Sequence, residues 1–159
     1  MHTKITLAVF LVAAMILIVG GIVLAGVFSR YAPEPSFRAI DSYALGESEI
    51  RVRIARSAQE ITKGLAGVTR LGKNEGMLFL LERLVQTNFW NKNMRVPVDV
   101  IWLREGRVVG ISQLPEESGD ERETISSPGL VDQVLELPFG WAEEHRLQVG
   151  ALLRAIGRR

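Results

Sequence analysis

Apolar and polar residues alternate in several stretches of the chain beyond residue 48, a pattern typical of half-buried β-strands. In residues 49–56 the apolar positions Ile50, Val52 and Ile54 are separated by arginines, which we expect to face water. Apolar or alternating runs bounded by turn residues indicate further strands at 76–81, 87–93, 98–104, 107–114, 131–139 and 151–156. Glu105 and Gly106 are expected to join two of these strands in a tight hairpin, and residues 115–129 to form an acidic loop. About six or seven such strands predict a mainly antiparallel sheet that is partly barrel-like.

Two short helices are expected beside this sheet. Ser57 and Glu60 have the spacing of a capping box, in which each side chain accepts a hydrogen bond from the other residue's backbone. A helix therefore begins after Ser57, and Gly64 and Gly67 bring it to an end. In residues 140–147 two glutamates precede a histidine and an arginine, the order that a helix dipole favours. The predicted fold class is α+β.

The N-terminal part of the chain has a different pattern, because residues 5–28 contain no charged side chain. As a helix this segment would extend about 36 Å at about 1.5 Å per residue, which is enough to cross a bilayer. Helices of soluble proteins carry a polar stripe, and this segment has none on any face. We therefore expect one N-terminal transmembrane helix, with the lipid bilayer as the partner of residues 5–28.

The membrane segment divides the chain into three parts. Residues 1–30 are the expected signal anchor, 31–48 a linker that leads into the domain, and 49–156 the folded domain. So short a tail before the helix favours a single-pass protein of the cell membrane with its C-terminal domain outside the cytoplasm. Small residues near the end of the apolar segment leave an alternative open, in which the signal is cleaved and the domain is exported.

Charge and rare residue types narrow the function classes. The 159 residues include nineteen Lys and Arg against eighteen Asp and Glu, so no basic surface for nucleic acid is predicted. The absence of cysteine excludes thiol catalysis and thiolate metal sites. His145 is the single histidine of the expected domain, which argues against a zinc helix and a serine triad. We expect no metal, no cofactor and no nucleic-acid partner.

The best site candidates lie in the stretch NFWNKNMRVPVDVIWL, residues 88–103, where polar side chains interrupt apolar strands. On a continuous strand Trp90 and Lys92 would share one face, and Asn93 would lie on the other. Pro97 cannot donate to a sheet ladder, so the chain must turn or run along an edge before Val98. These polar residues either shape a turn or line a binding site.

Asp99 and Glu136 are carboxyl groups at positions expected to lie near a core. A buried carboxylate needs hydrogen bonds or contact with water in a cleft. Asp99 could accept hydrogen bonds from the backbone or from the Asn93 amide and hold a turn, or it could line a pocket floored by Trp90. Glu136 likewise could have a structural role or line a pocket. If the two carboxyls converge in one pocket, they could act on a glycosidic bond.

Several motifs together resemble the family known as domain of unknown function 192. They are KGLAG at 63–67, GMLFLL at 76–81, FWNKNMRVPVD at 89–99 and VLELPFGWAEEHRLQVG at 134–150. The resemblance covers roughly residues 50–153. The chain departs from the family's central motif at Asn91, Met94 and Val98, which replace methionine, threonine and leucine.

The resemblance implies a small, mainly β fold that is often exported or membrane-anchored, and it implies no agreed activity. We interpret the chain as a binding or accessory module of the cell envelope, with Trp90, Asn93 and Asp99 as the main patch and Lys92 and Glu136 beside it. A tryptophan next to amide and carboxyl groups suits a sugar or a peptide. No catalytic residue is assigned.

Two alternatives stay open at this point. The first is a metal-independent hydrolase of envelope glycan or peptide that uses Asp99 with Glu136, and it requires both carboxyls in one cleft. The second is a protein-interaction domain, which predicts an exposed apolar patch and no concave pocket.

Overall fold

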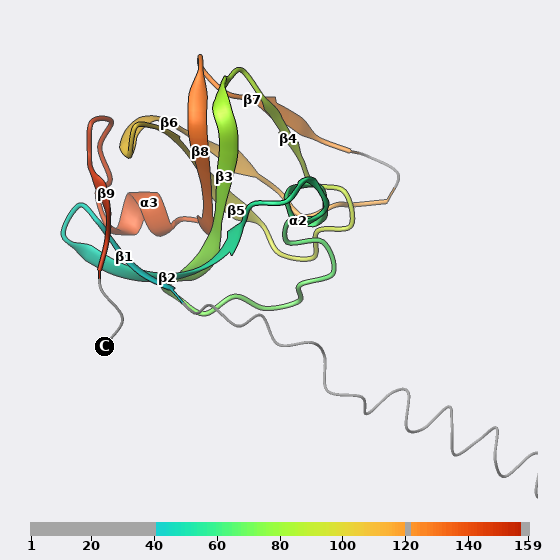
Figure 1. The fold of residues 1–159 in the computed structure, drawn as a ribbon. Helices are drawn as coiled ribbons and strands as arrows, with labels where there is room; N and C mark the ends of the chain where they lie inside the picture. The colour runs from blue at the N-terminus through green and yellow to red at the C-terminus, as the bar shows by residue number, and fades with distance from the viewer. Residues whose placement is uncertain (1–40, 120–121, 157–159) are drawn as a thin grey trace, which may run out of the picture. The chain divides into compact units, whose positions relative to one another are not determined.

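In a computed structural model of the chain, residues 41–119 and 122–156 are described (Figure 1). They belong to one structural unit, Pro35–Arg159. The predicted membrane segment, residues 5–28, lies outside the described residues. Within the two described ranges no helix combines the length and the apolar character needed to cross a bilayer.

The described residues form a mainly β fold. Seven strands make the main sheet, in the order β6-β5-β8-β3-β2-β1-β9, and β4 pairs with β7 in a separate ribbon. The strands are β1 (Asp41–Leu45), β2 (Ser48–Ala55), β3 (Glu75–Val85), β4 (Asn88–Trp90), β5 (Val98–Arg104), β6 (Arg107–Leu114), β7 (Thr124–Ser126), β8 (Val131–Pro138) and β9 (Leu153–Ala155). The described ranges also contain two short helices, α2 (Ala58–Lys63) and α3 (Trp141–Glu144).

The main sheet curls until its two outer strands approach each other (Figure 1). Arg107, the first residue of β6, forms an isolated bridge with Leu152, which directly precedes β9. The Val108 N–H also donates to the Ala151 carbonyl at 2.9 Å. These contacts lie at one end of β6, so the curl closes there only, and the expected curled sheet with two short helices is confirmed.

Most strand pairs are antiparallel, as expected, but β2 and β3 run parallel. The chain reaches β3 through α2 and residues 64–74, and a connection of this length is what parallel neighbours require. Two strands lie outside those expected from the pattern. β1 falls in the segment assigned to the linker, where it pairs with both β2 and β9, and β7 lies in an acidic loop stretch.

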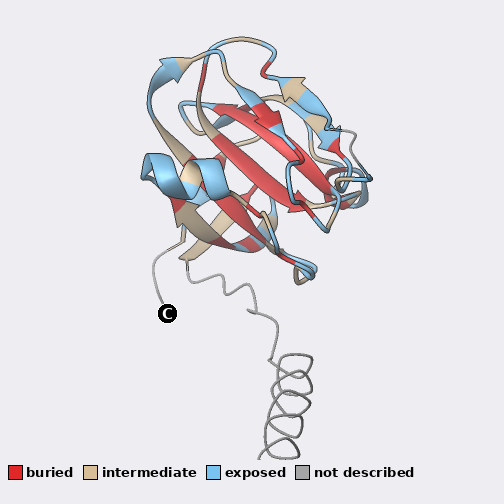
Figure 2. Cartoon of the chain, turned by 90° about the vertical axis from the view of Figure 1, so that its right-hand side faces the viewer, coloured by how far each residue is buried: buried red, intermediate tan, exposed pale blue. Residues whose placement is uncertain are grey.

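Two cores lie on opposite faces of the main sheet, and buried positions are concentrated in its central strands (Figure 2). The inner core, enclosed by the curl, includes Leu135, Leu137 and Trp141. The outer core includes Phe79, Val134 and the ribbon residue Phe89. Successive residues of a strand point to opposite faces, so neighbours on β8 contribute to different cores.

Candidate functional site

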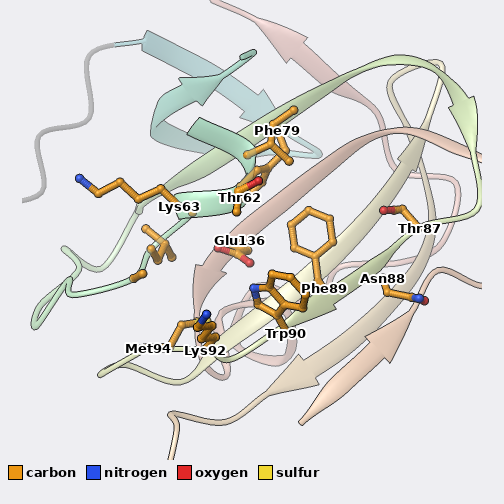
Figure 3. Close-up of a pocket in the computed structure, with 14 residues that line it drawn as sticks. Thr62, Lys63, Phe79, Thr87, Asn88, Phe89, Trp90, Lys92, Met94 and Glu136 are labelled. Carbon is orange, nitrogen blue, oxygen red and sulfur yellow. The ribbon is translucent and has the colours of Figure 1, made fainter. Parts of the chain in front are cut away.

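A cavity of about 190 Å³ opens on the outer face of the sheet, beside α2, β3 and β4 (Figure 3). Much of its wall is apolar, and this part includes Ile61, Leu65, Phe79, Phe89 and Met94. The polar lining comes from α2, from β4 with its flanking residues, and from one residue of β8. Segments distant in sequence thus form one concave site.

The capping box that starts α2 fixes one side of the cavity. As predicted, the Glu60 N–H donates to Ser57 Oγ at 3.2 Å, and the Ser57 N–H donates to Glu60 Oε2 at 2.9 Å. The Arg56 N–H donates to the same carboxylate oxygen, and these backbone hydrogen bonds lower the pKa of Glu60 to about 2. Gly64 ends the helix with a positive φ of 48°, which a side chain would disfavour. The helix is thereby held with Thr62 on the cavity wall.

Glu136 lies at the inner end of the cavity (Figure 3). Its side chain is only 2% exposed, and its Oε2 has no hydrogen-bond partner among the described residues. Burial disfavours the charged form and raises the pKa of Glu136 to about 8. The group is therefore mainly a neutral carboxylic acid at pH 7, with an O–H that is able to donate a hydrogen bond into the cavity.

Close packing of two strands fixes the backbone at Glu136. The residue pairs with Met77 on β3 and with Val100 on β5. A β-carbon added at Gly76 would lie 2.0 Å from the Glu136 carbonyl oxygen, so only glycine permits this approach of β3 to β8. The position of the carboxyl group is thus set by rigid sheet structure.

The two aromatic residues of β4 have different roles. Phe89 points inward and makes edge-to-face contacts with Phe79 and Trp102, at ring-centroid distances of 4.9 and 5.7 Å. Trp90 is 51% exposed and also lines the cavity. It thus lies at the rim of the cavity, with the buried Phe89 below it.

Two lysines line the cavity from different sides. Lys92 follows β4 and lies near Trp90 and Met94, whereas the side chain of Lys63, the last residue of α2, extends away from Glu136 (Figure 3). Both residues are exposed. The mouth of the cavity therefore carries positive charge above a neutral acid.

Asp99 lies on the other face of the sheet. It is 1% exposed and accepts hydrogen bonds from the Gly140 N–H at 3.1 Å and the Ala142 N–H at 2.8 Å. Gln113 Nε2 donates to the same side chain at 3.4 Å. Asp99 thus holds the turn at the start of α3, which fits the structural interpretation, although its partners differ from the Asn93 amide suggested by the sequence. It does not line the cavity beside Trp90.

Asp99 and Glu136 do not form a catalytic pair. In the register of β5 and β8, Asp99 lies opposite Leu137 and Val100 lies opposite Glu136. The two carboxyls are therefore offset by one residue and point to opposite faces. The hydrolase hypothesis required both groups in one cleft, and the geometry contradicts it.

Asn91 and Asn93 shape the turn that follows β4, whereas Asn88 lies within β4 itself. β4 ends at Trp90, so the strand expected to reach Asn93 is shorter than predicted. Asn91 is buried: its Nδ2 donates to the Glu116 carbonyl, and its Oδ1 accepts from the Glu123 N–H. Asn93 has a positive φ of 58°, and its backbone N–H donates to the Glu117 carboxylate at 2.7 Å. Its exposed side chain does not line the cavity.

The cavity therefore brings together Trp90, Lys92 and Glu136 of the predicted ligand-binding residues, and excludes Asn93 and Asp99. Sequence reasoning missed Thr62 and Phe79 as lining residues. Thr62 directly precedes the KGLAG motif, and Phe79 lies inside the apolar run 76–81, so both were in stretches singled out for other reasons. The signal in the sequence that could have found these two residues was their place in or beside motifs that follow one another in the order seen in the family.

Comparisons with known proteins establish the fold and the family. No curated protein matches the chain. A Sinorhizobium meliloti 1021 protein, described as a candidate transcription regulator, has 22% identity and a TM-score of 0.68, with 77% of this chain and 98% of that one covered. A Novosphingobium aromaticivorans DSM 12444 protein of unknown function has 28% identity and a TM-score of 0.64, with 71% and 83% covered. Residues 42–155 match the family DUF192, described as Uncharacterized ACR, so the chain belongs to the domain of unknown function 192 family.

Proposed function

We propose that the domain is a ligand-binding module of the cell envelope, with its binding site in the cavity beside α2 and β4. In this proposal residues 5–28 hold it at the membrane, and the domain lies on the extracytoplasmic side. The uncharged apolar segment supports the attachment to the membrane. The ligand is a small molecule or the end of a larger envelope glycan or peptide.

The observation that carries the proposal is the Glu136 carboxyl, which is buried, lacks a partner at Oε2 and lines a cavity. Leaving such a group without a hydrogen bond costs about 1–3 kcal/mol of stability. Buried polar groups without partners are rare and tend to mark sites with another role. A bound ligand with a hydrogen-bond acceptor would satisfy this group.

The cavity favours a ligand-binding module over the two alternatives. A pure protein-interaction domain was expected to lack a concave pocket, and this domain has one. The paired-carboxyl hydrolase needs a second carboxyl beside Glu136, and among the described residues no other Asp or Glu lines the cavity. Trp90 at the rim offers an exposed ring on which a sugar or peptide group can stack.

A binding screen on the full chain in detergent tests the proposal. Envelope sugars and short peptides would be titrated while tryptophan fluorescence and thermal unfolding are recorded. Trp90→Ala is expected to weaken binding of any hit roughly tenfold, because the stacking surface is lost. Phe139→Ala is the matched control, since Phe139 is 54% exposed and lies outside the cavity lining. A screen without any hit, or equal losses in the two variants, would refute the proposed site.

Membrane placement has a separate test. Protease added to intact spheroplasts is expected to digest the domain, whereas a cytoplasmic control protein stays intact. Full protection of the domain, with digestion only after lysis, would contradict the extracytoplasmic placement.

A further inference from the structure

The charges around the cavity define what its ligand must offer. The titratable residues that line it are Lys63 from α2, Lys92 after β4 and Glu136 from β8, while β3 contributes the apolar Phe79. Glu60, although on α2, is engaged in the capping box. With Glu136 neutral, the lining carries only positive charge. The potential at the mouth therefore favours an anion over a cation.

The inner end of the cavity offers a hydrogen-bond donor. Glu136 Oε2 is buried, and no described side chain donates a hydrogen bond to it. The ion pairs found among the described residues, Arg51–Glu75, Lys73–Glu144 and Arg122–Glu117, do not include this carboxyl. A buried acid without a cation keeps its proton, and its free O–H can meet a carbonyl or hydroxyl oxygen.

Between these two polar ends lies an apolar wall formed by Phe79, Phe89, Leu65 and Met94. The cavity volume of about 190 Å³ lies below the range of about 300–1,000 Å³ found for drug-sized ligands. It fits a molecule about the size of one acylated amino acid or one sugar unit. Lys92 lies near Trp90 at the mouth, and Glu136 lies deeper inside (Figure 3).

We propose that the cavity binds a small organic carboxylate whose acid group pairs with Lys92, whose apolar body lies along Phe79 and Phe89, and whose carbonyl or hydroxyl oxygen accepts a hydrogen bond from Glu136. This inference rests on the proposed ligand-binding function and adds the chemical class of the ligand. No covalent step is involved. Lys63 adds long-range attraction only, since its side chain extends away from Glu136 (Figure 3).

Four defined probes test the ligand class on the full chain by titration calorimetry. N-acetyl-L-leucine and N-acetylmuramic acid each carry a carboxylate and an acetyl carbonyl, one on an amino acid and the other on a sugar. N-acetyl-L-leucinamide keeps the carbonyl but lacks the charge, and tetraethylammonium is a permanent cation. We expect at least one of the two acids to bind. Its affinity should exceed that of the neutral amide by roughly tenfold, which is the effect of one charge-assisted hydrogen bond.

Variants and pH separate the two polar contacts. Lys92→Met is expected to remove the preference for the acid, whereas Arg95→Met, an exposed cation of the same turn outside the cavity, should leave it unchanged. Affinity of the wild type for the acid should fall about tenfold between about pH 6.5 and about pH 9, as Glu136 loses its proton. Glu136→Gln keeps an N–H donor, so binding should persist and the fall should disappear.

The outcomes distinguish this inference from the proposed function. Tighter binding of tetraethylammonium, growing stronger toward pH 9, would mean that an ionised Glu136 pairs with a cation, and it would overturn the carboxylate class. A failure of both acids at millimolar concentration would overturn it as well. If the envelope screen still yields a ligand sensitive to Trp90→Ala, the binding function survives, whereas the absence of any ligand refutes both.

Discussion

Asp99 and Glu136 are buried carboxyl groups one register step apart on neighbouring strands, yet their surroundings differ. Their side chains are 1% and 2% exposed. Asp99 faces the inner core, where two backbone N–H groups and one side-chain amide donate to it. Glu136 faces the outer core, where its Oε2 has no partner within the described part of the chain. Burial alone therefore does not separate a structural acid from a candidate binding group.

The distinguishing property is whether each buried polar atom has a partner. Asp99 satisfies N–H groups at the start of α3, which a helix cannot satisfy itself, and thereby joins β5 to the turn after β8. Glu136 adds no such link and reduces stability by its own desolvation. Replacing the two residues should therefore change stability in opposite directions.

The largest effect is expected for Asp99→Ala. The change leaves the Gly140 and Ala142 N–H groups without their acceptor, at about 1–3 kcal/mol each, so we expect a loss of roughly 4 kcal/mol in the free energy of unfolding. For a domain of this size the melting temperature should fall by roughly 10–20 °C. Glu49→Ala, an exposed carboxyl on β2, is the control and should change little. Similar melting temperatures for both variants would show that Asp99 does not hold the α3 turn.

A smaller effect of opposite sign is expected for Glu136→Gln. The folded-state pKa of Glu136, about 8, lies above its ordinary value of 4.5, so the folded protein retains a proton that the unfolded chain has released. The stability from this group is fully present below pH 4.5 and is lost as pH rises to about 8. The slope is about 1.4 kcal/mol per pH unit. The variant lacks this slope and should exceed the wild type by roughly 3 kcal/mol near pH 6.5, about two pH units above the ordinary pKa.

Urea unfolding at several pH values between 5 and 8 would measure this difference in the free energy of unfolding. Release of one proton corresponds to a slope of about 1.4 kcal/mol per pH unit. Glu49→Gln controls for loss of an exposed glutamate and should keep the wild-type slope. Parallel pH profiles for the wild type and Glu136→Gln would mean that Glu136 is ionised in the folded protein. Glu136 and Asp99 would then differ only in their hydrogen-bond partners and not in the sign of their effect on stability.

The smallest effect concerns Glu60, an exposed carboxyl that, like Asp99, accepts backbone N–H donors. Ser57→Ala removes the reciprocal bond of the capping box and should cost about 1 kcal/mol. The pKa of Glu60 is lowered to about 2, so its contribution is present above pH 4.5 and is lost as the pH falls toward 2. Amide exchange of α2 should quicken in Ser57→Ala and stay unchanged in Ser118→Ala, a control outside the helix. Equal exchange rates would rule out a role of the cap in holding the cavity wall.

Local pattern was sufficient to predict those elements that depend on near neighbours. The capping box at Ser57 and the hairpin between β5 and β6 are local, and Glu105 and Gly106 both take the positive φ that a tight turn needs. The parallel pairing of β2 with β3 and the bridge of Arg107 to Leu152 join residues far apart in sequence. Periodicity carries no information on such pairing, and this is why β1 was assigned to a linker.

The candidate site was predicted in part for the same reason. Trp90 and Lys92 follow from one unusual stretch, and the apolar neighbours of Glu136 on β8 indicated burial. Only the register of β5 with β8 decides that Asp99 and Glu136 point to opposite faces. Asn93 was misassigned because its sequence context suits a strand, whereas its left-handed backbone serves the turn.

The joining of β1 to β9 has a mechanical consequence. The Ile156 N–H donates to the Ser42 carbonyl at 2.9 Å, so the chain enters and leaves the described domain at neighbouring points. Tension applied between these points would open the β1–β9 ladder one bond at a time, as a zipper opens, at far lower force than shearing all bonds together. A pull on the C-terminus of a domain tethered at its N-terminus would thus peel off β9 first. The cavity, formed by α2, β3, β4 and β8, would still be intact when that strand had come away.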